Sequence, residues 1–82
     1  MMTTTTLPSA TSEIDVTGME PPEPMLAILE ALEALPERGA LLVRLDREPH
    51  PLFRVLDQND YRRHGGWQED HSYRLLIWRD AA

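Results

Sequence analysis

Three histidines and fourteen acidic residues are the side chains that could serve as acids, bases or metal ligands in this chain, and cysteine is absent. Sulfur transfer needs a thiolate, so the chain cannot carry a persulfide, and a cysteine zinc site is excluded as well. All eight basic residues are arginine, which leaves no lysine for a Schiff base. No Ser/His/Asp arrangement, catalytic carboxylate pair or glycine-rich phosphate loop is recognisable. We therefore predict no catalytic residues and no cofactor.

The histidines are the candidates for a metal site, because imidazole and carboxylate groups can both ligate metals. His50, His64 and His71 could act together with Asp46 or Asp70. Their spacing matches no compact ligand motif, such as two histidines one helical turn apart. We predict separate, surface-exposed histidines and no metal site, with His50 as the weak candidate for a ligand.

Two proline-containing loops, Gly18–Pro24 and Asp46–Pro51, each lie between a predicted strand and a predicted helix. Ligands of open α/β sheets favour the carboxyl ends of strands, and the amides at a helix start can bind an anion or a peptide carboxylate. The candidate residues in these loops are Pro21, Pro22, Pro24, Arg47 and His50. The glutamates that would repel an anion there are Glu20, Glu23 and Glu48. Capped helices with nothing bound are therefore the favoured interpretation.

The spacing of apolar residues predicts the elements that position these loops. One segment has apolar residues at helical spacing, and two prolines suit its first turn. Its apolar stripe consists of Met25, Ile28, Leu29, Leu32 and Leu35. Gly65-Gly66 interrupts a later strand and predicts a bulge or bend there. The predicted strands are Glu13–Val16, Ala40–Leu45, Tyr61–Gln68 and Tyr73–Arg79, and the predicted helices are Pro22–Leu35 and Pro51–Asp57.

The order of these elements is β-α-β-α-β-β. We predict an α/β (α+β) two-layer sandwich, in which a four-stranded mixed sheet carries two helices on one face. The first two strands should pair in parallel through a right-handed crossover. Residues 13–79 form the single predicted domain. Residues 1–12 are predicted to be a disordered tail, because they are rich in threonine and have no hydrophobic period, and residues 80–82 are a second tail.

Charge and hydropathy narrow the class of partner. The formal charge of -6 argues against nucleic acid, which binds mainly through basic contacts to phosphate. No apolar run is long enough to span a membrane, and Met1–Ala10 lacks the basic and apolar regions of a secretory signal. We therefore expect a cytoplasmic protein that binds another protein or a second copy of itself.

The last predicted strand has apolar residues on both of its faces. If Tyr73 and its alternate residues face the helices, then Arg74, Leu76 and Trp78 point outward, and we place Trp67 near them. An exposed surface of tryptophan, leucine and arginine has the composition of a protein interface. The opposite facing would bury Trp78 and remove this surface.

The segment that leads from the first strand into the first helix resembles the TusA/SirA-like fold. In TusA-type sulfur carriers a Cys-Pro-x-Pro motif lies at this place, and its cysteine carries a persulfide. The matching stretch here is Pro21-Pro22-Glu23-Pro24, with Pro21 at the cysteine position. The resemblance implies the helix-start geometry without the sulfur relay.

Between Glu13 and Arg79 the chain is more closely similar to a TusA-related bacterial family, domain of unknown function family 2249. The shared motifs are a Pro-Pro-Glu-Pro helix start, an Asp-x-x-Pro-x-Pro-Leu stretch at Asp46–Leu52, and a strand like Leu76–Arg79. Such domains often occur beside or fused to hemerythrin-like iron proteins and in nitrogen-oxide or respiratory gene settings, which implies an accessory role. Many relatives have a histidine where this chain has Leu45, so a metal role is not carried over from them.

Three hypotheses about function follow. The first is a non-catalytic binding or regulatory module, accessory to a redox or nitrogen-oxide/respiratory system, which docks through its open sheet face. The second is a metal- or haem-linked accessory protein that uses His50 and other ligands. The third is an enzyme with a small-ligand pocket at the two strand-to-helix loops, and no arrangement of residues in the sequence supports it.

Overall fold

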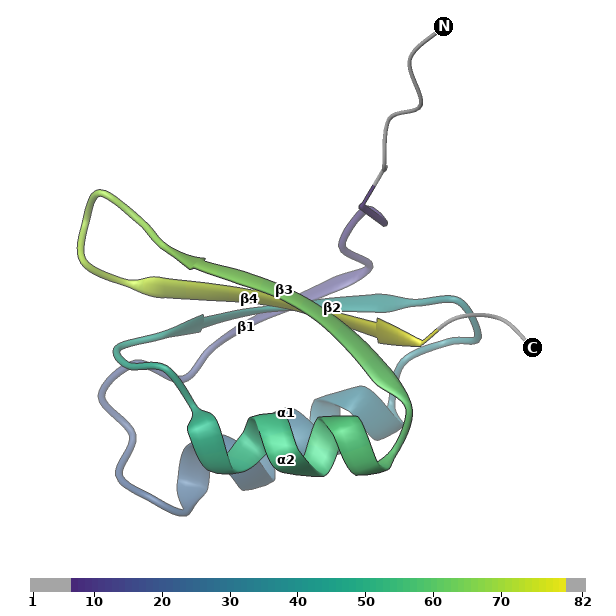
Figure 1. Cartoon of the computed structure of the whole chain (residues 1–82), viewed down its shortest axis with the longest axis horizontal. Helices are drawn as coiled ribbons and strands as arrows, with labels where there is room; N and C mark the ends of the chain where they lie inside the picture. The colour runs from purple at the N-terminus through teal and green to yellow at the C-terminus, as the bar shows by residue number, and fades with distance from the viewer. Residues whose placement is uncertain (1–6, 80–82) are drawn as a thin grey trace, which may run out of the picture.

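The computed structural model describes residues 7–79 and contains a four-stranded sheet with two helices. In chain order the elements are β1 (Ser12–Asp15), α1 (Glu23–Glu33), β2 (Ala40–Leu45), α2 (His50–Gln58), β3 (Tyr61–Trp67) and β4 (Tyr73–Arg79). The strands lie in the order β1-β2-β4-β3, with β1 parallel to β2 and the other pairs antiparallel. Both helices lie on one side of the sheet (Figure 1). This arrangement confirms the predicted β-α-β-α-β-β order, the mixed sheet and the two-layer sandwich.

The helix α1 forms where its apolar stripe can reach the sheet. Pro22 and Pro24 occupy the start of the helix, where a missing N–H removes no helical hydrogen bond. Ile28 and Leu32 are buried, and the rest of the predicted stripe packs partly buried against the same core. The helix ends shortly before Pro36, which cannot continue it.

The core lies between the helices and the two central strands. Leu41 and Val43 of β2 and Leu75 and Ile77 of β4 are fully buried, because alternate residues of each strand point toward the helices. From the helix layer, α2 contributes Leu52 and Leu56 to the same core. Of the two facings that the sequence allowed for β4, the structure therefore has the one in which Tyr73, Leu75 and Ile77 face the helices.

The strand β3 pairs without interruption, so the bulge considered at Gly65-Gly66 is wrong. Its pairing with β4 runs one residue to one from Tyr61 opposite Arg79 to Trp67 opposite Tyr73. A close contact with Tyr73 explains why position 65 is a glycine. A Cβ there would stand 2.8 Å from Cζ of Tyr73 and closer still to its hydroxyl oxygen, whereas nothing lies within 4 Å of a Cβ at Gly66.

The two ends of the domain differ slightly from the prediction. Thr11 and Ser12, placed in the tail by the sequence, belong to the sheet edge: the N–H of Thr11 donates to the carbonyl of Ala40 at 2.8 Å, and Ser12 begins β1. Residues 1–6 of the predicted disordered tail and the predicted tail at residues 80–82 lie outside the described part of the chain, which begins at residue 7. Among the helices described, none has the length and apolar character needed to cross a membrane.

Candidate functional site

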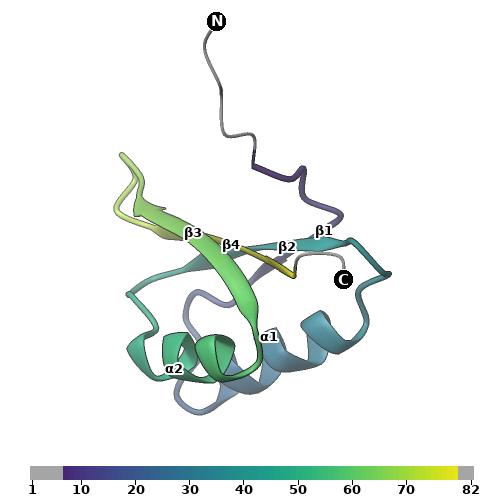
Figure 2. The same cartoon turned by 45° about the vertical axis from the view of Figure 1, so that its right-hand side comes forward.

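The side of the sheet that faces away from the helices is the first candidate surface, and we call it the open face. Figure 2 shows both helices on the other side of the sheet. An apolar strip crosses the open face where β2 pairs with β4, since Ala40 lies opposite Trp78 and Leu42 lies opposite Leu76. The side chains in this strip differ in exposure: Ala40 is buried, Leu76 is only 9% exposed, and Leu42 and Trp78 are half-buried. Trp78 and Leu42 therefore supply the accessible apolar surface of the strip.

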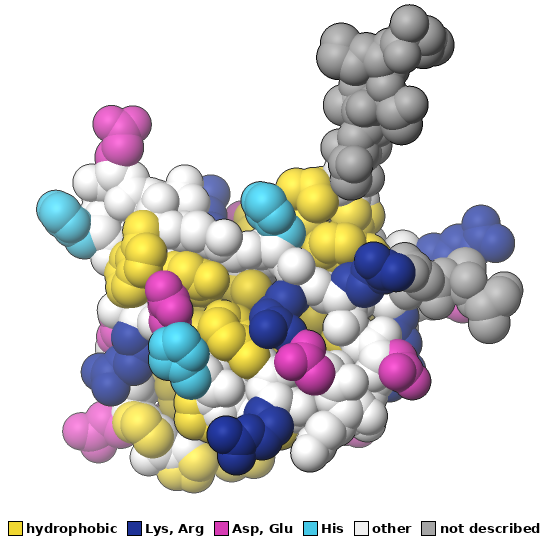
Figure 3. All heavy atoms as spheres, in the orientation of Figure 1, with side chains coloured by type: hydrophobic (Ala, Val, Ile, Leu, Met, Phe, Trp, Pro, Cys, Tyr) yellow, Lys and Arg dark blue, Asp and Glu magenta, His cyan; other side chains and the backbone are white. Residues whose placement is uncertain are grey.

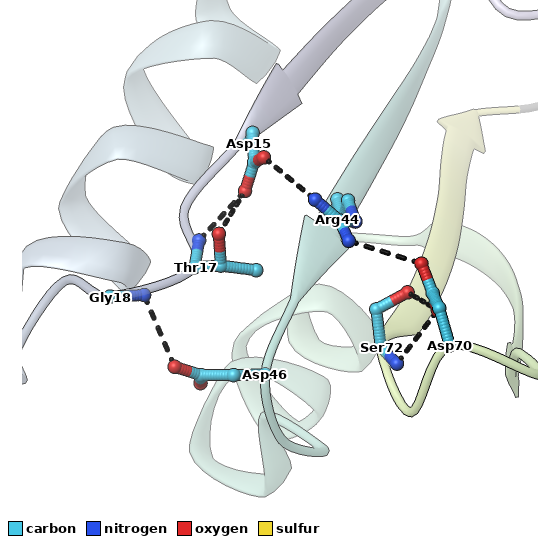
Figure 4. Close-up of polar contacts among 7 residues, drawn as sticks. All are labelled: Asp15, Thr17, Gly18, Arg44, Asp46, Asp70 and Ser72. Carbon is cyan, nitrogen blue, oxygen red and sulfur yellow. Dashed lines mark hydrogen bonds and ion pairs between the residues drawn. The ribbon is translucent and has the colours of Figure 1, made fainter.

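Two arginines stand directly opposite each other beside this strip. Arg44 of β2 pairs in register with Arg74 of β4. Like charges directly opposite each other destabilise a sheet unless they are neutralised. Asp15 and Asp70 neutralise Arg44, at 3.3 Å from its Nη1 and 3.0 Å from its Nη2 (Figure 4). In the part of the chain that the structure describes, Arg74 makes no ion pair and is exposed. Its positive charge is thus the uncompensated one of the pair.

A shallow depression of about 330 Å³ lies on the open face between β1 and these arginines. Its lining includes Leu42, Arg44 and Arg74, together with the acidic residues Glu13 and Asp15 of the edge strand. Asp15 is already engaged, because its carboxylate accepts hydrogen bonds from the N–H and hydroxyl of Thr17 and from Arg44. These bonds hold the pKa of Asp15 below its usual value, with the Thr17 hydroxyl as the main cause.

The turn between β3 and β4 is fixed to the open face by Asp70. Its carboxylate accepts hydrogen bonds from the hydroxyl of Ser72 at 2.6 Å, from the N–H of Ser72 at 3.0 Å and from Arg44. The hydrogen bonds from Ser72, followed by the effect of Arg44, lower the pKa of Asp70 to about 2. Asp70 therefore stays ionised and keeps the guanidinium of Arg44 in place at any ordinary pH.

Trp67 does not lie on the open face, so its predicted place beside Trp78 is wrong. It pairs with Tyr73 on the side of the sheet that the helices cover, and the two rings meet edge to face at 5.3 Å. The indole N–H of Trp67 donates to the carboxylate of Glu48 at 3.1 Å, and the side chain remains 53% exposed. Burial, followed by the negative charge of Glu48, raises the pKa of Tyr73.

A second candidate surface lies where the two strand-to-helix loops meet, and we call it the loop pocket. It has a volume of about 450 Å³ and a mainly apolar lining. The structure gathers Pro21, Pro22, Pro24 and Arg47 around this pocket, as their common place at the carboxyl ends of β1 and β2 predicted. His50 is not among the lining residues. Its imidazole is exposed and lies 3.2 Å from the carboxylate of Glu48.

Two aspartates hold the loops of this pocket in position. The carboxylate of Asp46, at the end of β2, accepts a hydrogen bond from the N–H of Gly18 in the other loop at 3.1 Å (Figure 4). This bond is the main cause of the lowered pKa of Asp46. Gly18 has φ +83°, a conformation that suits glycine, while Asp15 closes the preceding turn onto Thr17.

The three histidines do not form a site. His64 lies on the open face opposite Leu76, His71 lies in the β3–β4 turn, and His50 begins α2. In Figure 3 the histidine side chains, coloured cyan, are separated from one another. Across residues 7–79 no group of three or more histidine, aspartate or glutamate side chains converges as metal ligands do. No geometry in the structure therefore favours the hypothesis of a metal-linked accessory protein.

Sequence reasoning missed the ion network of Arg44 with Asp15 and Asp70. A local signal was present, because Asp15 precedes Thr17 by two residues and Asp70 precedes Ser72 by two residues. Aspartate at this spacing commonly accepts a hydrogen bond from the backbone two residues on. The sequence carried no signal that both aspartates form ion pairs with the same arginine, because those pairs depend on the register between strands.

The fold is similar to that of a solved SirA-like protein. The chain resembles the crystal structure of a SirA-like protein from Desulfitobacterium hafniense, with a TM-score of 0.74, 21% identity, and coverage of 83% of this chain and 96% of that chain. No curated protein matches the chain. Residues 13–79 match the family described as "Uncharacterized conserved protein (DUF2249)". The chain is therefore a member of this DUF2249 family and has a SirA-like fold, without the cysteine that a sulfur carrier would need.

Proposed function

We propose that the protein is a non-catalytic binding module that docks an acidic segment of a partner protein on its open face. The observation that carries the proposal is the combination of Trp78 and Arg74 on the side of the sheet that faces away from the helices. Trp78 offers apolar area, and Arg74 offers a positive charge that no described residue neutralises. Tryptophan and arginine are the residue types that most often dominate the binding energy of protein interfaces.

The distribution of charge supports an acidic partner. The whole chain has a formal charge of -6, yet the open face carries three of its eight arginines. These arginines are Arg44, Arg62 and Arg74. Asp15 and Asp70 already engage Arg44, so the guanidinium that a partner's carboxylate would meet on this part of the face is that of Arg74. Complementary charge of this kind raises specificity and the association rate.

The burial of the apolar strip further supports a binding role. Ala40 and Leu76 are buried in the folded chain, so a partner that covers the strip restricts little side-chain freedom at these two residues. The strip alone is small for a stable complex, and we therefore infer a partner that also engages the arginines at its border.

The biological setting is part of the proposal. We infer a regulatory or accessory module in a redox or nitrogen-oxide/respiratory system, on the resemblance described for the sequence. The cytoplasm is the usual compartment of a small domain that has no cysteine to form disulfides. A non-enzymatic role fits the absence of a nucleophilic thiol and the engagement of Asp15, Asp46 and Asp70 in structural hydrogen bonds.

Affinity capture tests the proposal, with cells that naturally produce the protein as the source of partners. The baits are the wild type, Arg74→Glu, Trp78→Ala and the control Arg54→Glu, which reverses an exposed charge on α2 in the other layer. The captured protein is then purified and titrated against each bait, after thermal denaturation has shown that all four are folded.

A single acidic partner should bind the wild type and Arg54→Glu alike, and added salt should weaken it. Binding to Arg74→Glu should fall by about tenfold or more, because the variant adds repulsion as well as removing attraction. Trp78→Ala should lose a similar amount. The proposal is wrong if all four baits retain the same partner with equal affinity, or if no partner binds after purification.

A further inference from the structure

The loop pocket has a floor made from the hydrophobic core. Four side chains that are at most 3% exposed form this floor: Val16, Ile28, Leu45 and Leu52. Concave, mostly apolar sites of about 300–1,000 Å³ are typical binding sites, and this pocket of about 450 Å³ falls in that range. It lies on the helix side of the sheet, so a ligand here would leave the open face accessible.

Two methionines border the pocket. Met19, in the β1–α1 loop, is 36% exposed, and Met25, in the first turns of α1, is partly buried against the core. Methionine has a flexible, polarisable side chain and adapts to apolar groups of different shape, which is why peptide-binding surfaces use it. The border therefore suits a bulky apolar side chain better than a rigid molecule of one fixed outline.

The backbone of the two loops offers almost no hydrogen-bond donors to a ligand. Five lining residues are prolines, which have no N–H: Pro21, Pro22, Pro24, Pro49 and Pro51. The neighbouring amides are already used, since Gly18 donates to Asp46, Glu23 donates to Glu20 and His50 donates to Glu48. Prolines and engaged amides suit an anion poorly, because an anion binds at free N–H groups. A ligand that brings donors would find carbonyl and carboxylate acceptors.

The charge at the border of the pocket is negative. Asp46 and Glu48 line it, and Arg47, the basic lining residue, lies 3.4 Å from the carboxylate of Asp46. Glu20 and Glu23 are exposed and flank the lining prolines in the β1–α1 loop. This border complements a cation.

We propose that the loop pocket binds a basic peptide segment of a partner protein, in which a bulky apolar side chain is flanked by arginine or lysine. The apolar side chain enters between Met19 and Met25, and the basic side chains meet Glu48 and the glutamates of the β1–α1 loop. This second surface differs from the open face in location and in the sign of the charge that it selects.

The two tryptophans allow the two surfaces to be tested separately. Trp67 donates to Glu48 at the pocket border, whereas Trp78 lies on the open face. In the variant Trp78→Phe, fluorescence reports only the surroundings of Trp67, and in Trp67→Phe it reports only those of Trp78. A cation that engages Glu48 competes for the acceptor of the Trp67 indole and changes its emission.

The probes are pools of short peptides with a central leucine, methionine or phenylalanine between arginines and lysines. Matched pools carry glutamate in place of every basic residue, and phenethylamine serves as a small apolar amine. Titrations follow Trp67 in the Trp78→Phe background. Met19→Ala and the pair Glu20→Arg, Glu23→Arg alter the pocket border, and Glu33→Arg reverses an exposed charge at the other end of α1 as the control.

The basic pool should bind at least about fivefold more tightly than the acidic pool. Met19→Ala and the double charge reversal should each weaken binding by about fivefold or more, with Glu33→Arg unchanged and circular dichroism showing that every variant is folded. Equal binding of both pools, binding of phenethylamine alone, no binding, or a response of Trp78 in place of Trp67 would each overturn this proposal. The acidic-partner result on the open face does not depend on any of these outcomes.

Discussion

At the scale of single residues, Asp70 shows how one carboxylate organises the open face. Its carboxylate accepts hydrogen bonds from the hydroxyl and the N–H of Ser72 and forms an ion pair with Arg44. Arg44 stands opposite Arg74 in the sheet, and Asp70 helps to neutralise its charge. Loss of this carboxylate would free the turn and release Arg44 at the same time. The effect should therefore depend on the ionisation of Asp70.

The pKa of Asp70 determines the pH range of that effect. Its ordinary value is 3.8, and in the folded protein the bonds from Ser72 lower it to about 2. A carboxyl group whose pKa is lowered by folding stabilises the folded state above its unfolded pKa, and this contribution is lost as the pH falls through the folded pKa. The contribution of Asp70 is thus complete above about pH 4 and disappears as the pH falls toward 2.

Asp70→Asn should accordingly be less stable than the wild type near neutral pH, and the difference should shrink as the pH falls from about 4 toward 2. Urea denaturation of both proteins over a pH series measures the difference. Glu69→Gln in the same turn controls for the general loss of a negative charge. A gap between wild type and Asp70→Asn that stays constant down to pH 2 would show that ionisation of Asp70 is not the cause.

At the scale of elements, β3 and β4 fit together through the ring of Tyr73. The ring lies across Gly65 of β3, and Trp67 meets its edge at 5.3 Å. The glycine is required by this close approach and not by the backbone, since β3 pairs with β4 without a bulge. The neighbouring Gly66 has open space at its Cβ position.

Gly65→Ala should therefore lower the free energy of unfolding by about 1–3 kcal/mol, because the added methyl group forces the Tyr73 ring from its site. Gly66→Ala is the matched control on the next residue and should leave stability unchanged or slightly improved. Chemical denaturation of the three proteins measures both effects. Equal stability of the two variants would contradict the packing described for Tyr73.

The same hairpin shows what the sequence could predict and what it could not. The sequence predicted both strands of the hairpin, but it left the facing of Tyr73 open between two alternatives, and the position expected for Trp67 was wrong. The predicted turn began at Glu69, whereas the observed pairing joins Trp67 to Tyr73 and leaves Gln68 in the turn. A slip of one residue in register moves every side chain of a strand to the other face. Sequence alone does not fix that register.

For the loops at the helix starts, the sequence predicted the location of the residues correctly and the ligand chemistry less well. The sequence placed Pro21, Pro22, Pro24 and Arg47 in two loops that follow parallel strands, and all four line the loop pocket. The anion that was considered for these loops fits poorly, because five lining prolines have no N–H and the amides of Gly18, Glu23 and His50 already donate within the protein. The apolar floor was harder to foresee, since it depends on how α1 and α2 separate above the sheet.

At the scale of the whole molecule, the fold presents two surfaces of opposite character. The open face combines Trp78 with arginines, and the loop pocket combines methionine and proline with carboxylates. Placing both helices on one side of the sheet creates this division, because it leaves the reverse side without a helix. The two proposals together describe an adaptor, which would hold an acidic segment on the open face and a basic segment in the loop pocket.

The central claim is that a partner covers the open face, and collisional quenching of Trp78 tests it most directly. The Trp67→Phe variant carries Trp78 alone, and acrylamide quenching is measured with and without the purified acidic partner. We predict that the partner protects Trp78 from acrylamide and that Arg74→Glu in the same background abolishes the protection. Unchanged quenching of Trp78 in a complex that has been shown to form would contradict the claim.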